Sequence, residues 1–394
     1  MSGLRCLVMG GSMAGLAAAG ALERSGWEAA VFERSRRPLE GRGAGIVLHP
    51  VIFEQLGRDP AAISARAAVL RYLGRDGVVA SEQPCDYRFI SYSALHGLLL
   101  EGVDAGSYHL GREVVDFASG TDGVEVVLAD GDTERGDLLV CADGIRSRAR
   151  RTLLPEVEPA YAGYVGWRGT VVERDLSAGA LDAFADAITY CVLPGSHILV
   201  YPIPGYDGSL EPGNRLINWV WYRNVEPGAL EELLVDRDGV RHDVSVGGGQ
   251  VPEATVAALA ADAERLLPPQ LVELVAGSEE PFFQVVFDIS APRMAFGDVA
   301  LIGDAAFALR PHVAAGTAKA VEDGRTLAAA LAGSPHDRAA GLRAWEADQL
   351  RLGRAAVERA REAGVRSQFD DSWQLGDPLP FGLREAGDSL MTGH

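Results

Sequence analysis

Two stretches of this sequence carry residues of the type and spacing that bind a nucleotide. In the first, Gly10, Ser12 and Gly15 follow an apolar run, and Glu33 ends the next apolar run. A tight turn into a helix brings backbone N–H groups to a pyrophosphate, and a carboxylate at the second strand end receives ribose hydroxyls. Ser12 replaces the usual middle glycine, but its hydroxyl is small and can hydrogen-bond phosphate. Glu33 favours FAD or NAD over NADP; a glycine turn needed only for packing is the alternative.

The second stretch is VALIGDAAFALRPHVAAGTAKAVEDG, residues 299–324. An apolar run ends at Asp304, and a helix is expected to begin near Gly316. The carboxylate could bind polyol hydroxyls, and the helix N-terminus could stabilise the negative charge of a reduced flavin. The alternative is a capped helix with Asp304 as an ordinary turn residue.

A third stretch, CADGIRSRARR at residues 141–151, places Asp143 and Gly144 at the end of an apolar run and before a basic helix start. Its alternative interpretation is a strand-to-helix turn with a solvated arginine face.

The elements around these residues follow from hydrophobic periodicity. Residues 4–9 and 29–33 read as buried strands around a helix at 16–25, which makes one β-turn-α-β unit. Residues 51–66 and 93–100 are expected to be helical, with short strands at 67–90. A hairpin around Asp130 and Gly131 precedes a buried strand at 137–142. Residues 162–290 read as an antiparallel sheet with one buried face, interrupted by a helix at 253–267. Helices at 316 onward and 338–364 precede a loosely held tail.

Composition excludes several classes of function. The 394 residues have a net charge of −19, and 47% are hydrophobic. Phosphate backbones need a basic surface, so we expect no nucleic-acid partner and no stable membrane association. The four cysteines are widely spaced, without a metal-ligand pattern, so we predict no metal site and a cytoplasmic protein. No signal peptide and no apolar run long enough to cross a bilayer is recognised.

The three motifs, in this order, resemble those of the single-component FAD-dependent aromatic hydroxylases, the para-hydroxybenzoate hydroxylase superfamily. Strings such as GGSMAGL, YAGYVGWRG, YPIPG and GDAAFALRPHVAAGTAKA are similar to the branch of the 2,6-dihydroxypyridine 3-monooxygenases. The resemblance covers most of the chain. It implies an α/β fold in which a Rossmann-like FAD-binding domain is interleaved with an antiparallel β-sheet substrate domain and followed by C-terminal helices.

The domain boundaries expected on this basis are discontinuous. The FAD-binding domain takes residues 1–75, 100–165 and 290–335. The substrate domain takes 76–99 and 166–289, and the C-terminal helical segment and tail take 336–394.

The resemblance implies a role for residues along the whole cofactor. The pyrophosphate turn would comprise Gly10, Gly11, Ser12, Met13, Ala14 and Gly15. The adenosine end would involve Glu33, Arg34, Arg112 and Val114, and the motif shared by FAD and NAD(P)H would involve Asp143, Arg146 and Arg150. The flavin and ribityl end would involve Gly45, Ile46, Val47, Asp304, Pro311, Ala314, Ala315, Gly316 and Thr317. Departures from the usual family pattern are Phe307, Ala314, Ala318 and the missing arginine near Tyr92.

The activity implied is the hydroxylation of an electron-rich aromatic ring, a hydroxypyridine or pyridone in this branch. Such enzymes consume NADH or NADPH and O2 and act through a C4a-hydroperoxyflavin. A base near the ring oxygen is expected. His312 is the candidate catalytic base, with His197 as a weaker one, and Arg168 is expected to bridge the sheet and the FAD domain. The candidate substrate contacts are Tyr201, Trp219, Trp221 and Tyr222; because adjacent strand residues face opposite ways, Trp221 and Tyr222 cannot both reach one pocket.

Several alternatives stay open at this point. A phenol hydroxylase that tailors a natural product in secondary metabolism, and a non-oxygenating flavoprotein reductase, are the main ones. A halogenase of the same fold is disfavoured because its W-x-W-x-I-P string and separate catalytic lysine are absent, and a nucleotide-bound regulatory protein without turnover is the most distant. The partners expected are a small aromatic substrate and O2. We also expect a homo-oligomer, such as a dimer.

Overall fold

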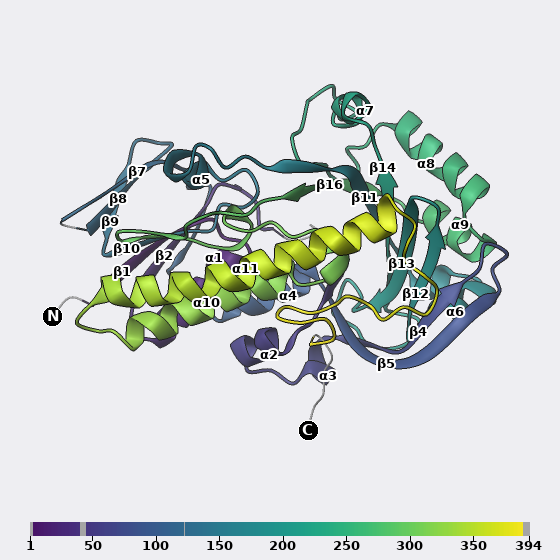
Figure 1. Cartoon of the computed structure of the whole chain (residues 1–394), viewed down its shortest axis with the longest axis horizontal. Coiled ribbons are helices and arrows are strands. Elements are labelled where there is room, and N and C mark those ends of the chain that lie inside the picture. The colour runs from purple at the N-terminus through teal and green to yellow at the C-terminus, as the bar shows by residue number, and fades with distance from the viewer. Residues whose placement is uncertain (1–2, 40–44, 122, 389–394) are drawn as a thin grey trace.

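The computed structural model describes residues 3–39, 45–121 and 123–388. The end of the expected tail, residues 389–394, lies outside this range. Three sheets and the helices that cover them make up the described chain (Figure 1). The α/β fold expected from the sequence is confirmed.

The first sheet has six strands and contains the β-turn-α-β unit at the N-terminus. Its order is β17-β18-β10-β1-β2-β6, and all neighbours are parallel except the edge pair β17 and β18. Parallel strands meet at one edge with their carboxyl ends, so the turns after β1, β10 and β18 lie together. The strands are β1 (Arg5–Met9), β2 (Glu28–Glu33), β6 (Tyr108–Leu110), β10 (Leu138–Cys141), β17 (Ala295–Phe296) and β18 (Val299–Leu301).

The second sheet has nine strands in the order β15-β16-β11-β14-β13-β12-β4-β5-β3. Its neighbours are antiparallel except β12 and β4. The strands are β3 (Gly45–Val47), β4 (Ala65–Leu73), β5 (Val79–Ser91), β11 (Ala160–Val172), β12 (Ala187–Leu193), β13 (Ser196–Ile203), β14 (Leu216–Asn224), β15 (Ser245–Val246) and β16 (Phe282–Asp288).

Both faces of this sheet are buried at its centre, so the expectation of one buried face is wrong. Every residue of β13 is buried, as are the first seven of β14. One face packs against helices α6 (Ala178–Phe184), α7 (Pro227–Leu233), α8 (Glu253–Leu266) and α9 (Pro269–Ala276). The other face packs with side chains of the C-terminal segment. Along β14, Trp219 and Trp221 belong to the first layer, and Val220 and Tyr222 belong to the second.

Helices α1 (Met13–Arg24) and α10 (Gly316–Ala332) pack closely beside the six-stranded sheet. A Cβ added at Gly324 would lie 2.7 Å from the backbone of Ala18, so small residues set this helix spacing. The long helix α11 (Arg338–Gln368) lies along α10 and reaches β13 and β14, which ties the two large sheets together (Figure 1).

The remaining elements are short. A three-stranded sheet contains β7 (Val114–Gly120), β8 (Gly123–Leu128) and β9 (Thr133–Gly136), and its last two strands form the expected hairpin. The other helices are α2 (Pro50–Leu56), α3 (Pro60–Ile63), α4 (Tyr92–Glu101), α5 (Arg148–Leu153) and the 3-10 turns η1 (Glu173–Asp175), η2 (Gly303–Ala305) and η3 (Pro311–Val313).

Two expectations about elements are wrong. The helix expected at 51–66 is two helices, because Gly57 takes a left-handed φ of 60° and Asp59 caps a new start before Pro60. The described part of the tail, residues 369–388, is held, not loose. Its Gly382 N–H donates to the carbonyl of Val313 at 3.0 Å, and Tyr72 donates to the carbonyl of Asp377 at 3.2 Å.

The domain division stays a prediction. Within the expected cofactor segment 1–75, β3 and β4 are hydrogen-bonded into the nine-stranded sheet.

Candidate cofactor and substrate site

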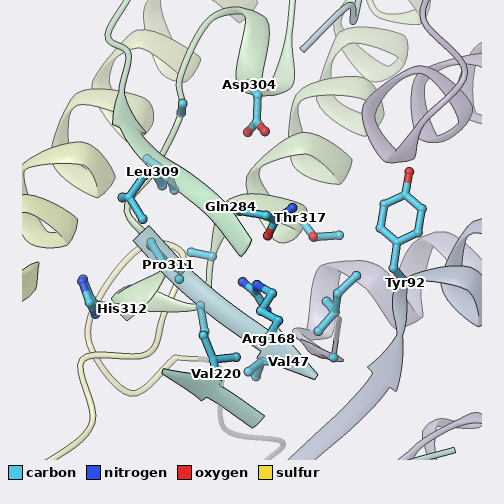
Figure 2. A pocket seen from close by; sticks show the side chains of 18 of the residues that line it. Val47, Tyr92, Arg168, Val220, Gln284, Asp304, Leu309, Pro311, His312 and Thr317 are labelled. Atoms are coloured by element: carbon cyan, nitrogen blue, oxygen red, sulfur yellow. The ribbon is translucent and has the colours of Figure 1, made fainter. Parts of the chain in front are cut away.

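One cavity lies between the two large sheets, and most candidate site residues line it (Figure 2). Its volume is about 390 Å³. Residues from the turn after β1, from β3, from the sheet and from the segment between η2 and α10 contribute to its wall. The candidates that line it are Ser12, Met13, Ala14, Gly45, Ile46, Val47, Tyr201, Tyr222, Asp304, Pro311, His312, Ala314, Ala315, Gly316 and Thr317.

The turn after β1 needs glycine at two points. Gly10 has a φ of 106°, and a Cβ there would lie 2.4 Å from the carbonyl oxygen of Ala142. A Cβ at Gly15 would lie 1.9 Å from the carbonyl oxygen of Gly10. The turn therefore passes close to the end of the neighbouring strand β10 and close to its own helix, as a pyrophosphate turn requires.

Ser12, the residue in place of the middle glycine, has a specific partner. It precedes α1 without capping the helix through its side chain, and its hydroxyl lies 2.6 Å from the hydroxyl of Tyr92. Tyr92 also lines the cavity and begins α4. Nearby, the Glu33 carboxylate is buried and accepts from the N–H groups of Gly11 and Ser35 at 2.9 and 2.8 Å. This places Glu33 against the turn, as expected for a group that binds ribose.

Asp304 faces the cavity from η2, which follows β18 (Figure 2). Its carboxyl is open to the cavity, and desolvation by the surrounding protein raises its pKa to about 6, an effect that the nearby Arg150 opposes. The preceding Gly303 has a φ of 58°, and its N–H donates to Asp323 at 2.9 Å. Helix α10 begins at Gly316 with no acidic residue in its first turn, so its positive end is open to the cavity.

The Asp143 motif is structural in this conformation. Its carboxylate accepts from the hydroxyl of Ser147 at 2.6 Å and from the N–H of Arg148 at 2.6 Å, and so caps α5. Arg150 is fully buried and donates to the carbonyls of Ala305 and Ile145 at 3.0 and 2.5 Å. It thereby fixes the loop that carries Asp304. Arg146 lies at the surface and pairs with an aspartate.

The structure does not bring every candidate cofactor residue to the cavity wall. Arg34 is exposed, and Val114 lies in the core. The backbone N–H of Arg112 donates to the carbonyl of Glu33 at 2.9 Å, while its side chain pairs with Asp130 and Asp132. The candidates outside the cavity lining are Gly10, Gly11, Gly15, Glu33, Arg34, Arg112, Val114, Asp143, Trp219 and Trp221.

The residues present fit FAD. Ser12 to Ala14, at the start of α1, and Asp304, with the start of α10, line the same cavity. The first turns of both helices contain no acidic residue, and N–H groups of a first helical turn have no partner within the helix. One end of the cleft thus suits a pyrophosphate, and the other suits a polyol and a ring system that becomes anionic.

One part of the cavity is an aromatic chamber, formed by Tyr190, His197, Tyr222 and Trp373. Tyr222 and His197 have ring centroids 4.8 Å apart, and His197 lies 4.9 Å from the ring of Trp373 and 6.1 Å from that of Tyr190. Tyr201 stacks on Phe89 at 4.1 Å and donates to the carbonyl of Gly45 at 2.9 Å. Flat apolar faces with few polar atoms suit an aromatic ligand.

Trp219 and Trp221 do not reach this chamber. Both lie in the layer between the sheet and its outer helices, where their indole N–H groups donate to Ser278 at 2.8 Å and Ser196 at 3.0 Å. Their proposed contact with a substrate is therefore corrected to core packing. Tyr222, one residue later on β14, faces the chamber, as strand alternation requires.

His312 lines the chamber from η3 (Figure 2). Its Nε2 lies 2.7 Å from the hydroxyl of Tyr164, and its Nδ1 is buried without a hydrogen-bond partner. Burial lowers the pKa of His312 well below its usual range, and His197 and Arg310 act in the same direction. The imidazole is therefore neutral. Burial also lowers the pKa of His197 to about 3, and Gln368 donates to its Nδ1 at 3.1 Å.

Arg168 also lines the cavity, and no hydrogen bond joins its side chain to the six-stranded sheet within the described chain. The expected bridge between sheet and FAD domain is therefore not observed.

Sequence reasoning missed several lining residues. Tyr92 could have been identified from the sequence, because it lies in the region where the usual arginine of the family is missing. Trp373 and Phe381 lie in a segment rich in Pro, Gly and Asp, whose composition gave no sign that it packs on the chamber.

Two kinds of feature are absent from the described residues. No group of three or more His, Cys, Asp and Glu side chains among them is placed to hold a metal ion. No helix among them has both the length and the apolar character needed to cross a membrane.

Comparison with known proteins identifies relatives over nearly the whole chain. The family described as FAD binding domain-like matches residues 161–288. The 2,6-dihydroxypyridine 3-monooxygenase of Paenarthrobacter nicotinovorans is 36% identical over 395 residues, which cover 98% of each chain. The 3-amino-4-hydroxybenzoate 2-monooxygenase of Streptomyces cremeus is 30% identical over 386 residues, with 93% of this chain and 88% of the relative covered.

Two solved structures superpose on this chain over most of its length. The structure of 2,6-dihydroxypyridine-3-hydroxylase from Arthrobacter nicotinovorans superposes with a TM-score of 0.92 at 35% identity and covers 97% of this chain and 98% of its own. Klebsiella pneumoniae HpxO, complexed with FAD and uric acid, superposes with a TM-score of 0.75 at 25% identity, over 94% and 90% of the two chains.

Proposed function

Since the chain belongs to the FAD-dependent aromatic-ring monooxygenases of the para-hydroxybenzoate hydroxylase superfamily, we propose that its substrate is a hydroxypyridine or pyridone. The enzyme class and the FAD cofactor expected from the sequence are confirmed by the relatives and the solved structures. The observation that carries the substrate class is the similarity to a dihydroxypyridine enzyme over 98% of both chains. The aromatic chamber of Tyr190, His197, Tyr222 and Trp373 supports a flat ring.

When bound, FAD supplies the redox chemistry with NAD(P)H and O2. The residues of this chain bind and position the two ring systems. Ser12 and the start of α1 would hold the pyrophosphate, Asp304 would accept from the ribityl hydroxyls, and Gly45 to Val47 with Pro311 and residues 314–317 would border the flavin. With both ligands bound, the two sheets would enclose the space between cofactor and substrate and so exclude bulk water from it.

His312 is the residue that we assign to the substrate hydroxyl. A neutral imidazole can accept a hydrogen bond from the hydroxyl or donate one to its ionised form. Because its pKa is depressed, His312 stays neutral at neutral pH and serves as a hydrogen-bond partner, while the hydroxyl proton of the ring leaves to solvent. Tyr164, whose hydroxyl lies 2.7 Å from Nε2, fixes the imidazole, and burial raises the pKa of this phenol so that it stays protonated. Tyr201 and Tyr222 complete the wall around the ring.

The finer features of the enzyme belong to the same proposal. We assign NADH or NADPH as the transient reductant, a homo-oligomer such as a dimer, and the cytoplasm as its location. Four free cysteines, three of them buried, support a reducing compartment. We also retain the division into a discontinuous FAD-binding domain, a substrate sheet and a C-terminal segment.

A second substrate class has support from a specific relative. The similarity to an aminohydroxybenzoate monooxygenase of Streptomyces cremeus favours a phenol in natural-product tailoring as the alternative.

The test is a purified holoenzyme assayed with NADH and with NADPH, in the presence of hydroxypyridines and aminohydroxybenzoates. We expect a yellow protein whose NAD(P)H oxidation rises with a hydroxypyridine. A response to aminohydroxybenzoates alone would replace the substrate class by the alternative. Stimulation by none of these rings would contradict both.

A further inference from the structure

Arg168 is a charged side chain directed into the cavity from the centre of the nine-stranded sheet. It lies on β11, where it pairs with Val220 of β14 and Phe282 of β16. Gly166, two residues earlier, also lines the cavity, whereas Trp167 packs into the opposite layer. In Figure 2 the guanidinium of Arg168 points into the cavity, below Asp304 and above Val47 and Val220. Strand geometry therefore holds this cation at the boundary between the flavin residues and the aromatic chamber.

The three buried arginines of the described chain have a carboxylate or backbone carbonyls as partners within the protein. Arg215 pairs with Glu173 at 2.7 Å, Arg310 pairs with Asp288 at 2.8 Å, and Arg150 donates to three backbone carbonyls. Arg168 differs from them, since no carboxylate of the described residues lies within ion-pair distance of it. Its Nε is buried without a hydrogen-bond partner.

The groups around Arg168 do not neutralise it. Tyr201 on β13 is its polar neighbour, and the charge of Arg168 also acts on the hydroxyl of Tyr222 on β14. Burial keeps the pKa of Tyr201 raised, at about 12, so this phenol stays neutral. His197 and His312 are neutral as well, and Asp304 is the acidic residue of the described cavity lining. Arg168 is partly buried, and its Nε is inaccessible. Because a cation held in such a cavity without a counter-charge is stabilised by an anionic ligand, the chamber suits an anion.

We propose that Arg168 receives the ionised ring oxygen of the substrate, and so selects the anionic form of the hydroxypyridine and holds it beside the flavin cleft. The inference rests on the proposed function and adds the residue that determines the charge of the ligand. Ionisation raises the electron density of the ring, and a guanidinium at the oxygen stabilises that form in the bound state. The ring ionises by losing its proton to solvent; Arg168 would hold the resulting charge, and the neutral His312 would add a hydrogen bond to the same oxygen.

The flavin is the other group that could become anionic in this cavity. The N-terminus of α10, which begins at Gly316 and has no acidic residue in its first turn, already provides positive potential to that end. Arg168 lies on the sheet that forms the substrate chamber. We therefore assign it to the substrate.

The test measures binding to the oxidised, FAD-loaded protein under anaerobic conditions, followed by the change in the flavin absorption spectrum. The probes are 2,6-dihydroxypyridine, the non-ionising 2,6-dimethoxypyridine, and benzoate as a ring-borne anion of other chemistry. For the wild type, the affinity for 2,6-dihydroxypyridine should rise with pH as the probe ionises. In R168M it should fall about 10- to 100-fold and lose that pH dependence, while the dimethoxy compound is unaffected. R168K should recover part of the loss.

R223M is the matched control. Arg223 lies on β14, contacts Trp221 on the outer face of the same sheet and pairs with Asp262, so its loss should leave probe binding unchanged. If R168M binds the ionised probe as tightly as the wild type does, or alters only FAD affinity or the spectrum of the reduced flavin, the assignment is wrong.

Failure of the proposed function gives a different pattern. If no hydroxypyridine binds the wild type, but benzoate binds it and not R168M, the substrate class is wrong and the role of Arg168 stands. If neither probe binds the wild type, the assignment of Arg168 is overturned too.

Discussion

Ala314 adopts a left-handed backbone conformation at the edge of the cofactor cleft. Its φ is 52° and its ψ 25°, and its carbonyl lies 2.8 Å from Nε2 of the buried His49. A residue with a Cβ pays about 1 kcal/mol in this region, whereas glycine does not. The resemblance had marked this position, since relatives usually carry glycine there. Alanine in place of the usual glycine therefore introduces local backbone strain at position 314, and the surrounding contacts hold the residue in this conformation.

We expect A314G to leave the free energy of unfolding unchanged or to raise it by up to about 1 kcal/mol, because relief of strain offsets the greater freedom of the unfolded chain. A318G, in the interior of α10, should lower it by about 1 kcal/mol or more. Urea unfolding of the FAD-loaded variants provides the comparison. Equal destabilisation by both substitutions would show that Ala314 is not strained.

Asp304 provides a prediction about pH. Its pKa of about 6 means that the carboxyl is mostly protonated at pH 5 and mostly ionised at pH 7. The ionised form would accept hydrogen bonds from the ribityl hydroxyls, so FAD should bind up to about tenfold more tightly at pH 7 than at pH 5. Fluorescence titration of the apoprotein with FAD measures this. D304N should bind FAD weakly at both pH values and lack the dependence; an unchanged dependence in D304N would assign it to another group.

At the residue scale, the sequence identified the groups that bind a cofactor better than those that meet a substrate. Motifs such as the turn at Gly10 impose local geometry, so they can be recognised along the chain. The chamber brings together side chains from β12, β13, β14, η3 and the tail. No local sequence pattern indicates that these side chains lie close together in the folded chain. Strand alternation did predict that Trp221 and Tyr222 face opposite ways, but not which of them faces inward.

The segment after α11 acts as a wall of the chamber. Arg359 of α11 donates to the carbonyls of Gly382 and Leu383 at 3.1 and 2.8 Å, and Arg366 pairs with Asp377 at 2.5 Å. These bonds hold the chain so that Trp373 and Phe381 line the cavity. Composition rich in turn residues predicted a loose tail, because it reports local backbone preference and not tertiary anchoring.

We expect W373A to raise the KM for the ring substrate about 10- to 100-fold, since an aromatic face against His197 and Tyr190 is lost. FAD affinity should not change, because Trp373 lies on the substrate side. L375A is the control, as Leu375 is in the same segment but 52% exposed. Steady-state kinetics with FAD titration tests this, and an unchanged KM in W373A would remove the segment from the chamber wall.

Helix α10 carries a buried ion pair behind the loop that contains Asp304. Lys319, the single lysine of the chain, pairs with Asp323, and both side chains are inaccessible. Asp323 also accepts from the N–H of Gly303, the residue before Asp304. The pair therefore connects helix α10 to the loop that presents the carboxylate.

K319M should lower the free energy of unfolding by about 3–5 kcal/mol, because it leaves the Asp323 charge buried without a partner. The double variant K319M/D323N should recover part of this loss, since asparagine is neutral and keeps an acceptor for Gly303. Denaturant unfolding of both variants decides the matter. A double variant as unstable as K319M would show that packing of Lys319, and not its charge, is what matters.

At the scale of the whole molecule, function depends on the cavity between two sheets of different construction. The six-stranded sheet gathers its turns at one edge, and the nine-stranded sheet supplies an aromatic face and Arg168. Helix α11 spans both and places the C-terminal segment over the chamber. The order of motifs along the chain predicted that these parts are interleaved. Which face of the large sheet meets the cofactor depends on long-range packing, and the sequence did not reveal it.

The central claim is that this protein inserts one atom of O2 into an electron-rich ring. The most direct measurement is the mass of the product formed from a hydroxypyridine, with NAD(P)H as reductant, under ¹⁸O-labelled O2. The account predicts NAD(P)H oxidation that depends on the ring compound and a product that carries one ¹⁸O atom. Oxidation of NAD(P)H that yields only hydrogen peroxide with every ring tested, or a product whose oxygen comes from water, would contradict it.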